Sequence, residues 1–391
     1  MEDAFTPAKA TYQPGFFVSS RASSFAPPSG TPVHSPGEHV ISAHYRRLRQ
    51  QLLVEPKTWL ITGVAGFIGS NLLQDLLSLG QRVIGLDNFA TGHRANLNDV
   101  LSQTGSGKAH FRMMEGDIRD LPTCRSACEG VDYVLHHAAL GSVPWSIEDP
   151  IRTNAVNVDG FVNVLVAAKA ARAKRVVYAS SSAVYGDTPD NPQVEHSTGR
   201  PLSPYAASKS TDEAYALAFQ ASYGLETIGL RYFNVFGRRQ DPAGPYAAVI
   251  PRWIDNMVAG RPCEIFGDGE TTRDFCYVAN VVQANLLAAT VTESATGHVY
   301  NVAAGRSVSL NELFRMLRDE LPRDENSYSD AGALYKPFRA GDVRFSCASI
   351  EKAQRMLSFS PTHDVARGIA EALPWYARNR VSARDLNLVG A

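Results

Sequence analysis

Three residues in the middle of the chain, Ser181, Tyr205 and Lys209, have types and spacing suited to acid–base chemistry. Tyr205 and Lys209 stand four residues apart in the segment PYAASK, so on a helix they share one face. An ammonium group beside a phenol favours the phenolate, which matters because an unperturbed tyrosine, with a pKa of about 10, is a poor base at neutral pH. The pair therefore predicts an acid–base apparatus built around a tyrosine.

A glycine-rich turn upstream, Gly63-Val-Ala-Gly66-Phe-Ile-Gly69, predicts a nucleotide site. The apolar run 57–62 before it indicates a buried parallel strand, and the apolar-periodic stretch 67–79 after it indicates a helix. Glycine permits the tight turn and the close approach of backbone to a pyrophosphate, while the helix N-terminus offers free N–H groups to the anion. Together with the distant tyrosine and lysine, this turn indicates redox chemistry on a bound dinucleotide.

Asp87 ends a second predicted strand, 82–87, about twenty residues past the glycines, where a carboxylate can accept hydrogen bonds from both ribose hydroxyls. The same carboxylate would repel a 2′-phosphate, which favours NAD over NADP. His93 and Arg94 lie nearby and limit that preference.

The elements that must position these groups alternate along the chain. Strand candidates at 110–115, 133–136, 175–180 and 227–232 are separated by helical stretches, which predicts an α/β fold with a Rossmann-type doubly wound parallel sheet. We expect substrate beyond the C-terminal ends of these strands, where Ser181 falls.

Two domains are expected. An NAD-binding domain would span 43–237, and a smaller C-terminal substrate-binding domain would span 238–391, with 274–303 returning to the first. Residues 1–42 are rich in Pro, Ser and Gly without an amphipathic period, so we expect them to be disordered.

Composition narrows the remaining possibilities. A net charge of −1 gives no electrostatic case for nucleic acid, and no apolar run approaches the ~20 residues needed to span a bilayer. The five cysteines match neither a disulfide nor a zinc pattern. These features favour a reduced, cytoplasmic protein without a metal site.

From about residue 43 to the C-terminus, the chain resembles the extended short-chain dehydrogenase/reductase family. Besides the GxxGxxG spacing and YxxxK, the matching segments are GDIRD (116–120), LHHAAL (135–140), VYASSSAVYG (177–186), LRYFNVFG (230–237), RDFCYV (273–278) and FRAGDVR (338–344). The resemblance implies NAD contacts from Gly63, Gly66, Phe67, Ile68, Gly69, Asp87, Asn88, Asp117, Ile118, Ala138, Tyr205 and Lys209.

Within that family the chain is similar to nucleotide-sugar 4-epimerases. The likeness implies that Tyr205 takes the proton of the sugar 4-hydroxyl as hydride leaves C4 for NAD, that Ser181 hydrogen-bonds the same oxygen, and that Lys209 holds the nicotinamide ribose. The 4-keto sugar would then turn over, so that hydride returned to its opposite face inverts C4. Ser182 is the second choice for the role of Ser181.

The main rival within the family is a 4,6-dehydratase, which needs an additional acid and base for elimination. Dehydratases of the family it resembles typically carry Thr-Asp-Glu at the serine position, whereas this chain has Ser181-Ser182-Ala183. The missing carboxylates speak against dehydration.

The C-terminal half carries the resemblance that bears on the nucleotide. Asn234, Arg273, Arg339 and Asp342 are similar to the family's uridine diphosphate contacts, with the two arginines on the diphosphate and Asp342 near the uridine ribose. Arginine's fixed fork suits phosphate oxygens.

Ser346 concerns which sugar is accepted. By resemblance, epimerases restricted to UDP-glucose and UDP-galactose typically carry Tyr at this position. A small side chain leaves room for an N-acetyl group, and Gly141, Ser142 and Gln240 also resemble the subgroup that prefers UDP-GlcNAc and UDP-GalNAc in bacterial polysaccharide pathways. Trp145 departs from that subgroup, which tends to have a polar or basic residue there. A UDP-GlcNAcA or UDP-glucose 4-epimerase and a non-catalytic NAD-binding module remain as alternatives.

In relatives, helices that correspond to 154–171 and 204–223 pair across a twofold axis, which implies a homodimer. A buried face within one chain is the alternative for these alanine-rich helices.

Overall fold

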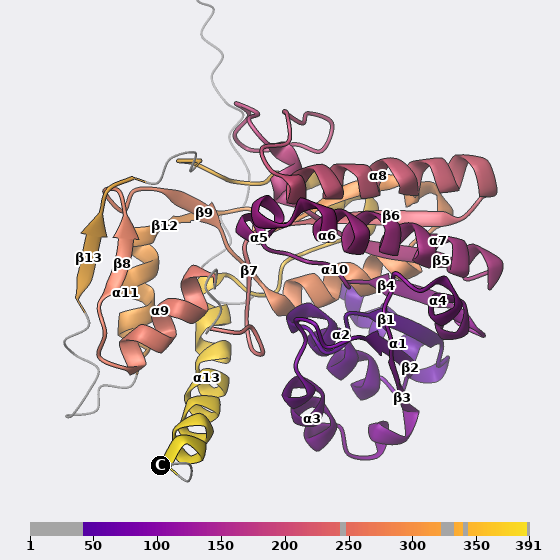
Figure 1. Ribbon diagram of the computed structural model, residues 1–391, viewed down its shortest axis with the longest axis horizontal. Helices are drawn as coiled ribbons and strands as arrows, with labels where there is room; N and C mark the ends of the chain where they lie inside the picture. Colours follow the sequence, from indigo (N-terminus) through magenta and orange to yellow (C-terminus); the bar gives the residue numbers. More distant parts are fainter. Residues whose placement is uncertain (1–41, 243–247, 322–331, 339–342, 389–391) are drawn as a thin grey trace, which may run out of the picture. The chain divides into compact units, whose positions relative to one another are not determined.

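A seven-stranded sheet lies at the centre of the fold (Figure 1). The computed structural model describes residues 42–242, 248–321, 332–338 and 343–388. The strands of the sheet are β1 (Thr58–Thr62), β2 (Arg82–Asp87), β3 (Phe111–Glu115), β4 (Tyr133–His136), β5 (Arg175–Ser181), β6 (Glu226–Tyr232) and β11 (His298–Val302). Their order is β11-β6-β5-β4-β1-β2-β3, and every neighbouring pair is parallel. This order confirms the predicted Rossmann-type doubly wound sheet.

The chain adds β2 and β3 on one side of β1 and then β4 on the other side. Open α/β sheets bind their ligands at such a switch point, here between β1 and β4. β1 is apolar because it is covered on both faces: Trp59, Leu60 and Ile61 are almost completely buried. β5 runs one residue further than predicted, because Ser181 still pairs with Tyr232 of β6.

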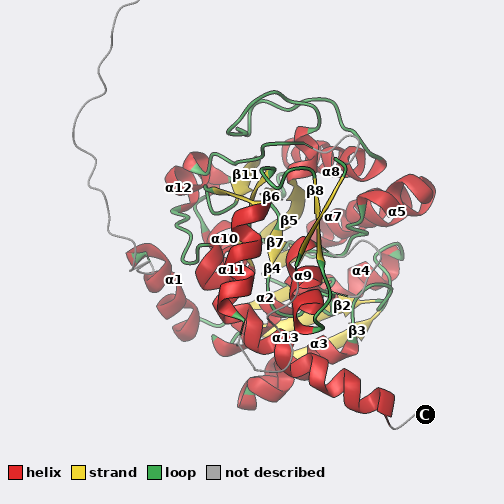
Figure 2. Ribbon diagram, turned by 90° about the vertical axis from the view of Figure 1, so that its left-hand side faces the viewer, coloured by secondary structure: helices red, strands yellow, loops and turns green. Residues whose placement is uncertain are grey.

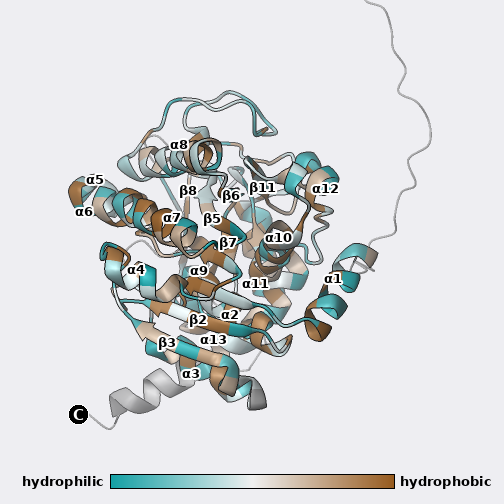
Figure 3. Cartoon of the chain, turned by 90° about the vertical axis from the view of Figure 1, so that its right-hand side faces the viewer, coloured by the Kyte–Doolittle hydropathy of each residue, from teal (hydrophilic) through white to brown (hydrophobic). Residues whose placement is uncertain are grey.

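Helices cover both faces of the sheet, as Figures 2 and 3 show. On one face, α2 (Phe67–Ser78) packs against α10 (Val278–Thr290), which also contacts β5, β6 and α12 (Glu351–Leu357). On the other face, α7 (Gly160–Ala170) packs against α4 (Leu121–Cys128) and α8 (Pro204–Tyr223). Each layer has its own apolar cluster of buried side chains.

The remaining helical segments near the sheet are short. They are α1 (Ala43–Val54), α3 (Arg94–Gln103), η1 (Gly105–His110), α5 (Val143–Glu148), α6 (Pro150–Asn154), η2 (Ala155–Asp159), η3 (Ser182–Tyr185) and η4 (Glu293–Ala295). The segment η2 is a single π-helical turn between α6 and α7, a feature that often occurs at functional sites.

A third apolar cluster lies beyond the sheet, on the left of Figure 1, and we call the elements around it the cap. The cap consists of α9 (Val249–Val258), β8 (Cys263–Phe266), β9 (Thr272–Asp274), β12 (Ser307–Ser309), α11 (Leu310–Glu320), β13 (Ala333–Lys336) and α13 (Val365–Leu388). Its small sheets pair β13 with β8 and β12 with β9. The short strands β7 (Val235–Phe236) and β10 (Cys276–Tyr277) pair where the chain passes from the sheet to the cap.

Among the described residues, no helix combines the length and apolar character that crossing a bilayer requires.

Candidate active site

The glycine turn after β1 is built so closely that side chains would not fit. Gly63 has φ of +70°, and a Cβ there would lie 2.7 Å from the backbone N of Ala138. A Cβ on Gly69 would lie 2.1 Å from the carbonyl oxygen of Gly63. Gly66 is the N-cap of α2 without a side-chain capping bond, so the first N–H groups of that helix, at Phe67 and Ile68, stay open to an anion.

Asp87 stands at the end of β2 and is 8% exposed. One carboxylate oxygen accepts the N–H of Ala65 at 2.9 Å and the other accepts the N–H of Phe89 at 2.8 Å. Burial raises the pKa of this carboxyl group, and the two backbone donors oppose the shift. Asp87 therefore also holds the glycine turn in place, a role that the sequence did not indicate.

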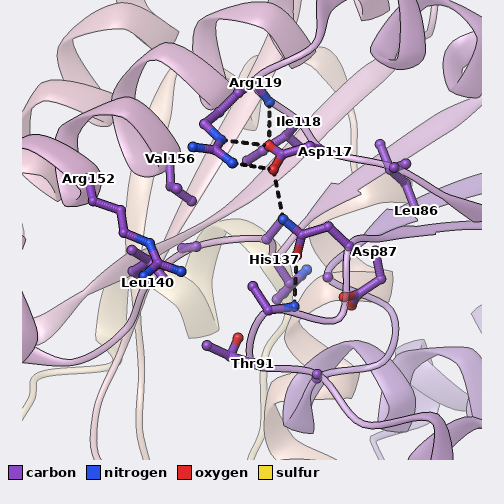
Figure 4. A pocket seen from close by; sticks show the side chains of 18 residues that line it. Leu86, Asp87, Thr91, Asp117, Ile118, Arg119, His137, Leu140, Arg152 and Val156 are labelled. Atoms are coloured by element: carbon purple, nitrogen blue, oxygen red, sulfur yellow. Dashed lines mark hydrogen bonds and ion pairs between the residues drawn. The ribbon is translucent and has the colours of Figure 1, made fainter.

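A cavity opens beside these residues (Figure 4). On its rim the Asp117 carboxylate accepts Asn88 Nδ2 at 2.8 Å and two guanidinium N–H groups of Arg119, at 3.0 and 2.7 Å. The hydrogen bonds with Arg119 hold the pKa of Asp117 below its ordinary value. The predicted NAD contacts that line this cavity are Gly63, Gly66, Asp87, Asn88, Asp117, Ile118 and Ala138.

The three consecutive serines at the end of β5, of which Ser180 and Ser181 belong to the strand and Ser182 follows it, have different surroundings. Ser180 is 3% exposed and donates its hydroxyl to Glu213 of α8. Ser181 Oγ accepts the N–H of Ala183 at 3.1 Å, which leaves its own proton available for a substrate oxygen. Ser182 begins η3. Of the three, Ser181 lies at the C-terminal end of the sheet with a free hydroxyl donor, as its predicted role requires.

Helix α8 begins where it does because Ser203 Oγ accepts the N–H of Ala206 at 3.1 Å and Pro204 suits the first turn. This start places Tyr205 in the first turn, half-buried, and Lys209 one turn later on the same face. The helix packs against β5 and η3, and thus against the segment that carries Ser181.

Lys209 is 2% exposed, and its Nζ lies 3.1 Å from Oδ2 of Asp212, which is 1% exposed. Burial alone would lower the pKa of Lys209, but the charges of Asp212 and Tyr205 outweigh it and raise the pKa above the ordinary lysine value. The ammonium group thus stays charged although it is buried.

Two histidines lie beside this group: His136 is the last residue of β4, and His137 follows it. His136 is 1% exposed and its Nδ1 lies 2.9 Å from Thr62 Oγ1, while His137 Nε2 lies 2.9 Å from the hydroxyl of Tyr232. Burial lowers the pKa of both, that of His137 to about 3. Both rings are therefore neutral at physiological pH.

The predicted substrate contacts come from several loops. Asn234 donates to the carbonyl of Asp274, Gln240 donates to that of Val235, and Arg273 lies half-buried in β9 with one N–H on the carbonyl of Thr272. Gln240 Oε1 is buried and has no hydrogen-bond partner among the described residues.

The residues predicted around the sugar lie on two segments. Ser142 Oγ accepts the N–H of Trp145 and caps α5, and a Cβ on Gly141 would meet no atom within 4 Å. Ser346 is half-buried on the other segment, next to Cys347. Arg339 and Asp342 lie outside the described residues.

Sequence reasoning missed three residues that the structure brings to the site. Arg152 of α6 lines the cavity across from Asp87 and Thr91 (Figure 4), and its guanidinium has no partner among the described residues. Asn157 of the π-helical turn accepts the N–H of Leu140 at 2.8 Å and donates to Ser208 of α8 at 3.0 Å. Asp212, the third, follows YxxxK by three residues, so only its spacing from Lys209 could have indicated it.

These observations test whether NAD fits. The glycine turn lets backbone approach a diphosphate, the N-terminus of α2 is uncapped by side chains, and Asp87 stands where a ribose is bound in such folds. The residues present fit NAD.

A metal site is a different matter. In the described parts of the chain, no three His, Cys, Asp or Glu side chains gather so that they could hold an ion. The five cysteines are free thiols, and burial raises the pKa of Cys124 and Cys128 on α4 to about 12.

Comparison with known proteins agrees with this site. The family model described as NAD dependent epimerase/dehydratase matches residues 59–303. A putative UDP-glucose 4-epimerase of Methanocaldococcus jannaschii is 37% identical over 323 residues, which cover 82% of this chain and 98% of the relative. UDP-glucuronate 4-epimerase 6 of Arabidopsis thaliana is 32% identical over 335 residues, covering 81% and 71%.

Among solved structures, the UDP-N-acetylglucosamine 4-epimerase from Methanobrevibacter ruminantium M1, in complex with UDP-N-acetylmuramic acid, is similar with a TM-score of 0.75. It is 37% identical and the match covers 83% of this chain and 99% of that one. The chain therefore belongs to the NAD dependent epimerase/dehydratase family, and its cofactor is NAD.

Proposed function

We propose that the protein inverts C4 of UDP-N-acetylhexosamines, interconverting UDP-GlcNAc and UDP-GalNAc through a transient 4-keto sugar. Its class is that of an NAD-dependent UDP-sugar 4-epimerase, an isomerase. The proposal is supported by the position of Ser181 at the end of β5 and of Tyr205 and Lys209 in the first two turns of α8, a helix that packs against β5 and η3.

The chain's own residues supply the proton chemistry. We assign Tyr205 as the group that takes the proton from the sugar 4-hydroxyl and later returns it. Ser181 donates a hydrogen bond to the same oxygen, because its Oγ already accepts from Ala183. Lys209, charged although buried, favours the phenolate of Tyr205 and binds the nicotinamide ribose. Bound NAD would supply the hydride acceptor and donor that inversion at C4 requires, and Asp87 and Lys209 would hold its two riboses.

The structure gives no support to dehydration. The carboxylates nearest to this machinery are Asp212 and Glu213 of α8, and both are paired with buried cations, Lys209 and Arg231. Neither is free to act as the additional acid or base of an elimination.

Support for an N-acetyl substituent comes from the size of two positions. Ser346 carries a small side chain on the segment that packs beside Asp274, and Gly141 has open space around its Cα. The relative from Methanobrevibacter ruminantium, named for UDP-N-acetylglucosamine, supports the same sugar class. The relatives named for UDP-glucose and UDP-glucuronate define the competing substrates.

The first experiment incubates the purified protein, without added NAD, with UDP-GlcNAc, UDP-GlcNAcA and UDP-Glc separately, and follows C4 inversion by NMR. Faster conversion of UDP-GlcNAc, abolished in Tyr205→Phe, would support the proposal. Preferred conversion of UDP-GlcNAcA or UDP-Glc would replace the sugar and keep the epimerase. No conversion with NAD added would leave an NAD-binding module that has lost the chemistry.

We further propose a homodimer that buries the exposed apolar side chains of α5, α6 and α8. Figure 3 shows hydrophobic residues on α5 and α6. Ile147 of α5 is 62% exposed and Ile151 of α6 is 82% exposed. Leu217 of α8 is 53% exposed. Sedimentation equilibrium should show a dimer for the unmodified protein and a monomer for Leu217→Lys. A monomeric wild type would contradict the proposal.

A further inference from the structure

Asp212 is a buried carboxylate for which neither the fold nor the proposed reaction has yet supplied a reason. It is 1% exposed, and its Oδ1 has no hydrogen-bond partner among the described residues. A buried charge is costly unless it is paired, so the contact between its Oδ2 and the ammonium of Lys209, at 3.1 Å, is the interaction that can justify its ionised form.

The neighbouring carboxylate on the same helix, that of Glu213, differs from Asp212 in its partners. Glu213 receives two N–H groups of Arg231, at 2.9 and 2.8 Å, together with the hydroxyl of Ser180. Its charge is thus balanced by a cation of β6, and it ties α8 to the ends of β5 and β6. Asp212 is left as the counter-charge of Lys209.

Three other titratable groups beside this pair are neutral at physiological pH. Burial raises the pKa of Tyr178, on β5, well above its ordinary value, and burial lowers the pKa of His136, at the end of β4, and of His137, which follows it. Among the described residues, Lys209 and Asp212 thus form one buried ion pair on α8, and Glu213 forms a second with Arg231 of β6.

We propose that Asp212 is a positioning residue that fixes the ammonium of Lys209 and, through its negative charge, sets the pH range in which Tyr205 and Lys209 work. The inference rests on the roles proposed above for those two residues. Three N–H donors belong to the ammonium, and the contact with Asp212 occupies one, which leaves two for the tyrosine and the cofactor ribose.

The sign of the effect follows from electrostatics. The negative charge of Asp212 favours the charged form of Lys209 and partly offsets the field that favours a phenolate at Tyr205. Removing that charge should let the tyrosine ionise at lower pH and should also let the lysine lose its proton at lower pH. The acidic and the basic limb of the plot of kcat against pH should therefore both move to lower pH.

The test variant is Asp212→Asn, which keeps the shape and an acceptor oxygen but removes the charge. Both limbs of the kcat profile for UDP-GlcNAc should shift by about one pH unit to lower pH, with KM little changed. The matched control is Glu226→Gln, which removes the partner of another buried cation, Arg175, at the opposite end of β5 and β6. It should lower the thermal midpoint and leave both limbs in place.

A second readout needs no sugar substrate. Tyrosinate absorbance is titrated in the NAD-bound protein, with the Tyr205→Phe spectrum subtracted so that only this residue is followed. The midpoint should fall in Asp212→Asn and stay in Glu226→Gln. If the amide variant does not fold, Asp212→Ser, which leaves room for water beside the ammonium, carries the same expectation.

Superimposable profiles and midpoints in wild type and the charge-removing variant would overturn the inference and leave Asp212 a structural partner only. A wild type that turns over no UDP-sugar, but whose tyrosinate midpoint still responds to Asp212, would overturn the proposed function instead.

Discussion

Arg239 is joined to Asp99 by an ion pair that spans 140 residues of sequence, with Nη1 2.8 Å from Oδ2. The guanidinium is completely buried and also reaches Ser70, Asn71 and Gln74 of α2. The loop that follows β7 is thereby held to α2, the helix that begins at the glycine turn. Trp375 of α13 lies 3.3 Å from the same carboxylate, which connects the cap to this point.

Breaking that pair should destabilise the fold. Asp99→Asn leaves a buried guanidinium without its counter-charge, so the free energy of unfolding should fall by about 3 kcal/mol in a urea titration. The control is Glu115→Gln, which breaks the exposed pair with Arg94 and should change it by less than about 0.5 kcal/mol. Equal effects of the two variants would contradict the assignment.

His136 should make stability depend on pH below neutrality. Its folded-state pKa is lowered by burial, so the unfolded chain binds more protons once the pH drops below the ordinary histidine value of about 6.5. Its contribution is fully present above that pH and is lost as the pH falls, at up to about 1.4 kcal/mol per pH unit. Urea titrations at several pH values should give a shallower dependence for His136→Asn. An unchanged slope would mean that other groups cause the acid sensitivity.

Arg152 should hold the diphosphate of NAD, because it is a cavity-lining guanidinium without a protein partner among the described residues, whereas Arg119 is occupied by Asp117. Arg152→Gln should weaken NAD binding about tenfold or more in a calorimetric titration, the value of a charge-assisted hydrogen bond. Arg125→Gln, on exposed α4 surface, is the control.

Adenosine and ADP separate two roles of Arg152. If the side chain binds the diphosphate, its removal weakens ADP and leaves adenosine unchanged. Equal weakening of both ligands would show that Arg152 stacks on the base instead.

Ser346 should decide which sugar fits. Ser346→Tyr fills the space proposed for the N-acetyl group, so kcat/KM for UDP-GlcNAc should fall at least about tenfold while that for UDP-Glc is kept or rises. The control is Ser346→Ala, which keeps a small side chain and should keep the preference for UDP-GlcNAc. Ser349→Tyr is unsuitable as a control because the N–H of Ser349 is hydrogen-bonded to the carbonyl of Gln193. A ratio of the two sugars that is unchanged by Tyr would contradict the argument.

The parts of the site that depend on local sequence could be predicted. The glycine turn, the end of β2 and the start of α8 are each defined by a few adjacent residues, and the alternation of strands and helices predicted a doubly wound parallel sheet. The end of β5 was placed one residue early because pairing with β6, which extends the strand through Ser181, has no signal within the strand itself.

The residues that were missed depend on packing between distant segments. Arg152 lines the cavity only because α6 lies across from Asp87, and Asn157 links Leu140 to Ser208 of α8 only through its place in the π-helical turn. The hydrogen bond between Asp87 and the N–H of Ala65, which accompanies the ribose contact proposed for Asp87, also requires the folded loop. Such relationships leave no local pattern in the sequence.

The buried carboxylate of Asp274 accepts N–H groups from Ala304, Gly305 and Ala348. Arg273 directly precedes Asp274 in the chain, and Ala348, two residues after Ser346, donates its N–H to the Asp274 carboxylate. This carboxylate is therefore an anchor for both the proposed diphosphate contact and the residue proposed to select the sugar. A change of side chain at 346 leaves this anchor in place. The sugar selection proposed for Ser346 can therefore change independently of the diphosphate contact proposed for Arg273 and of the proton transfer proposed for Tyr205.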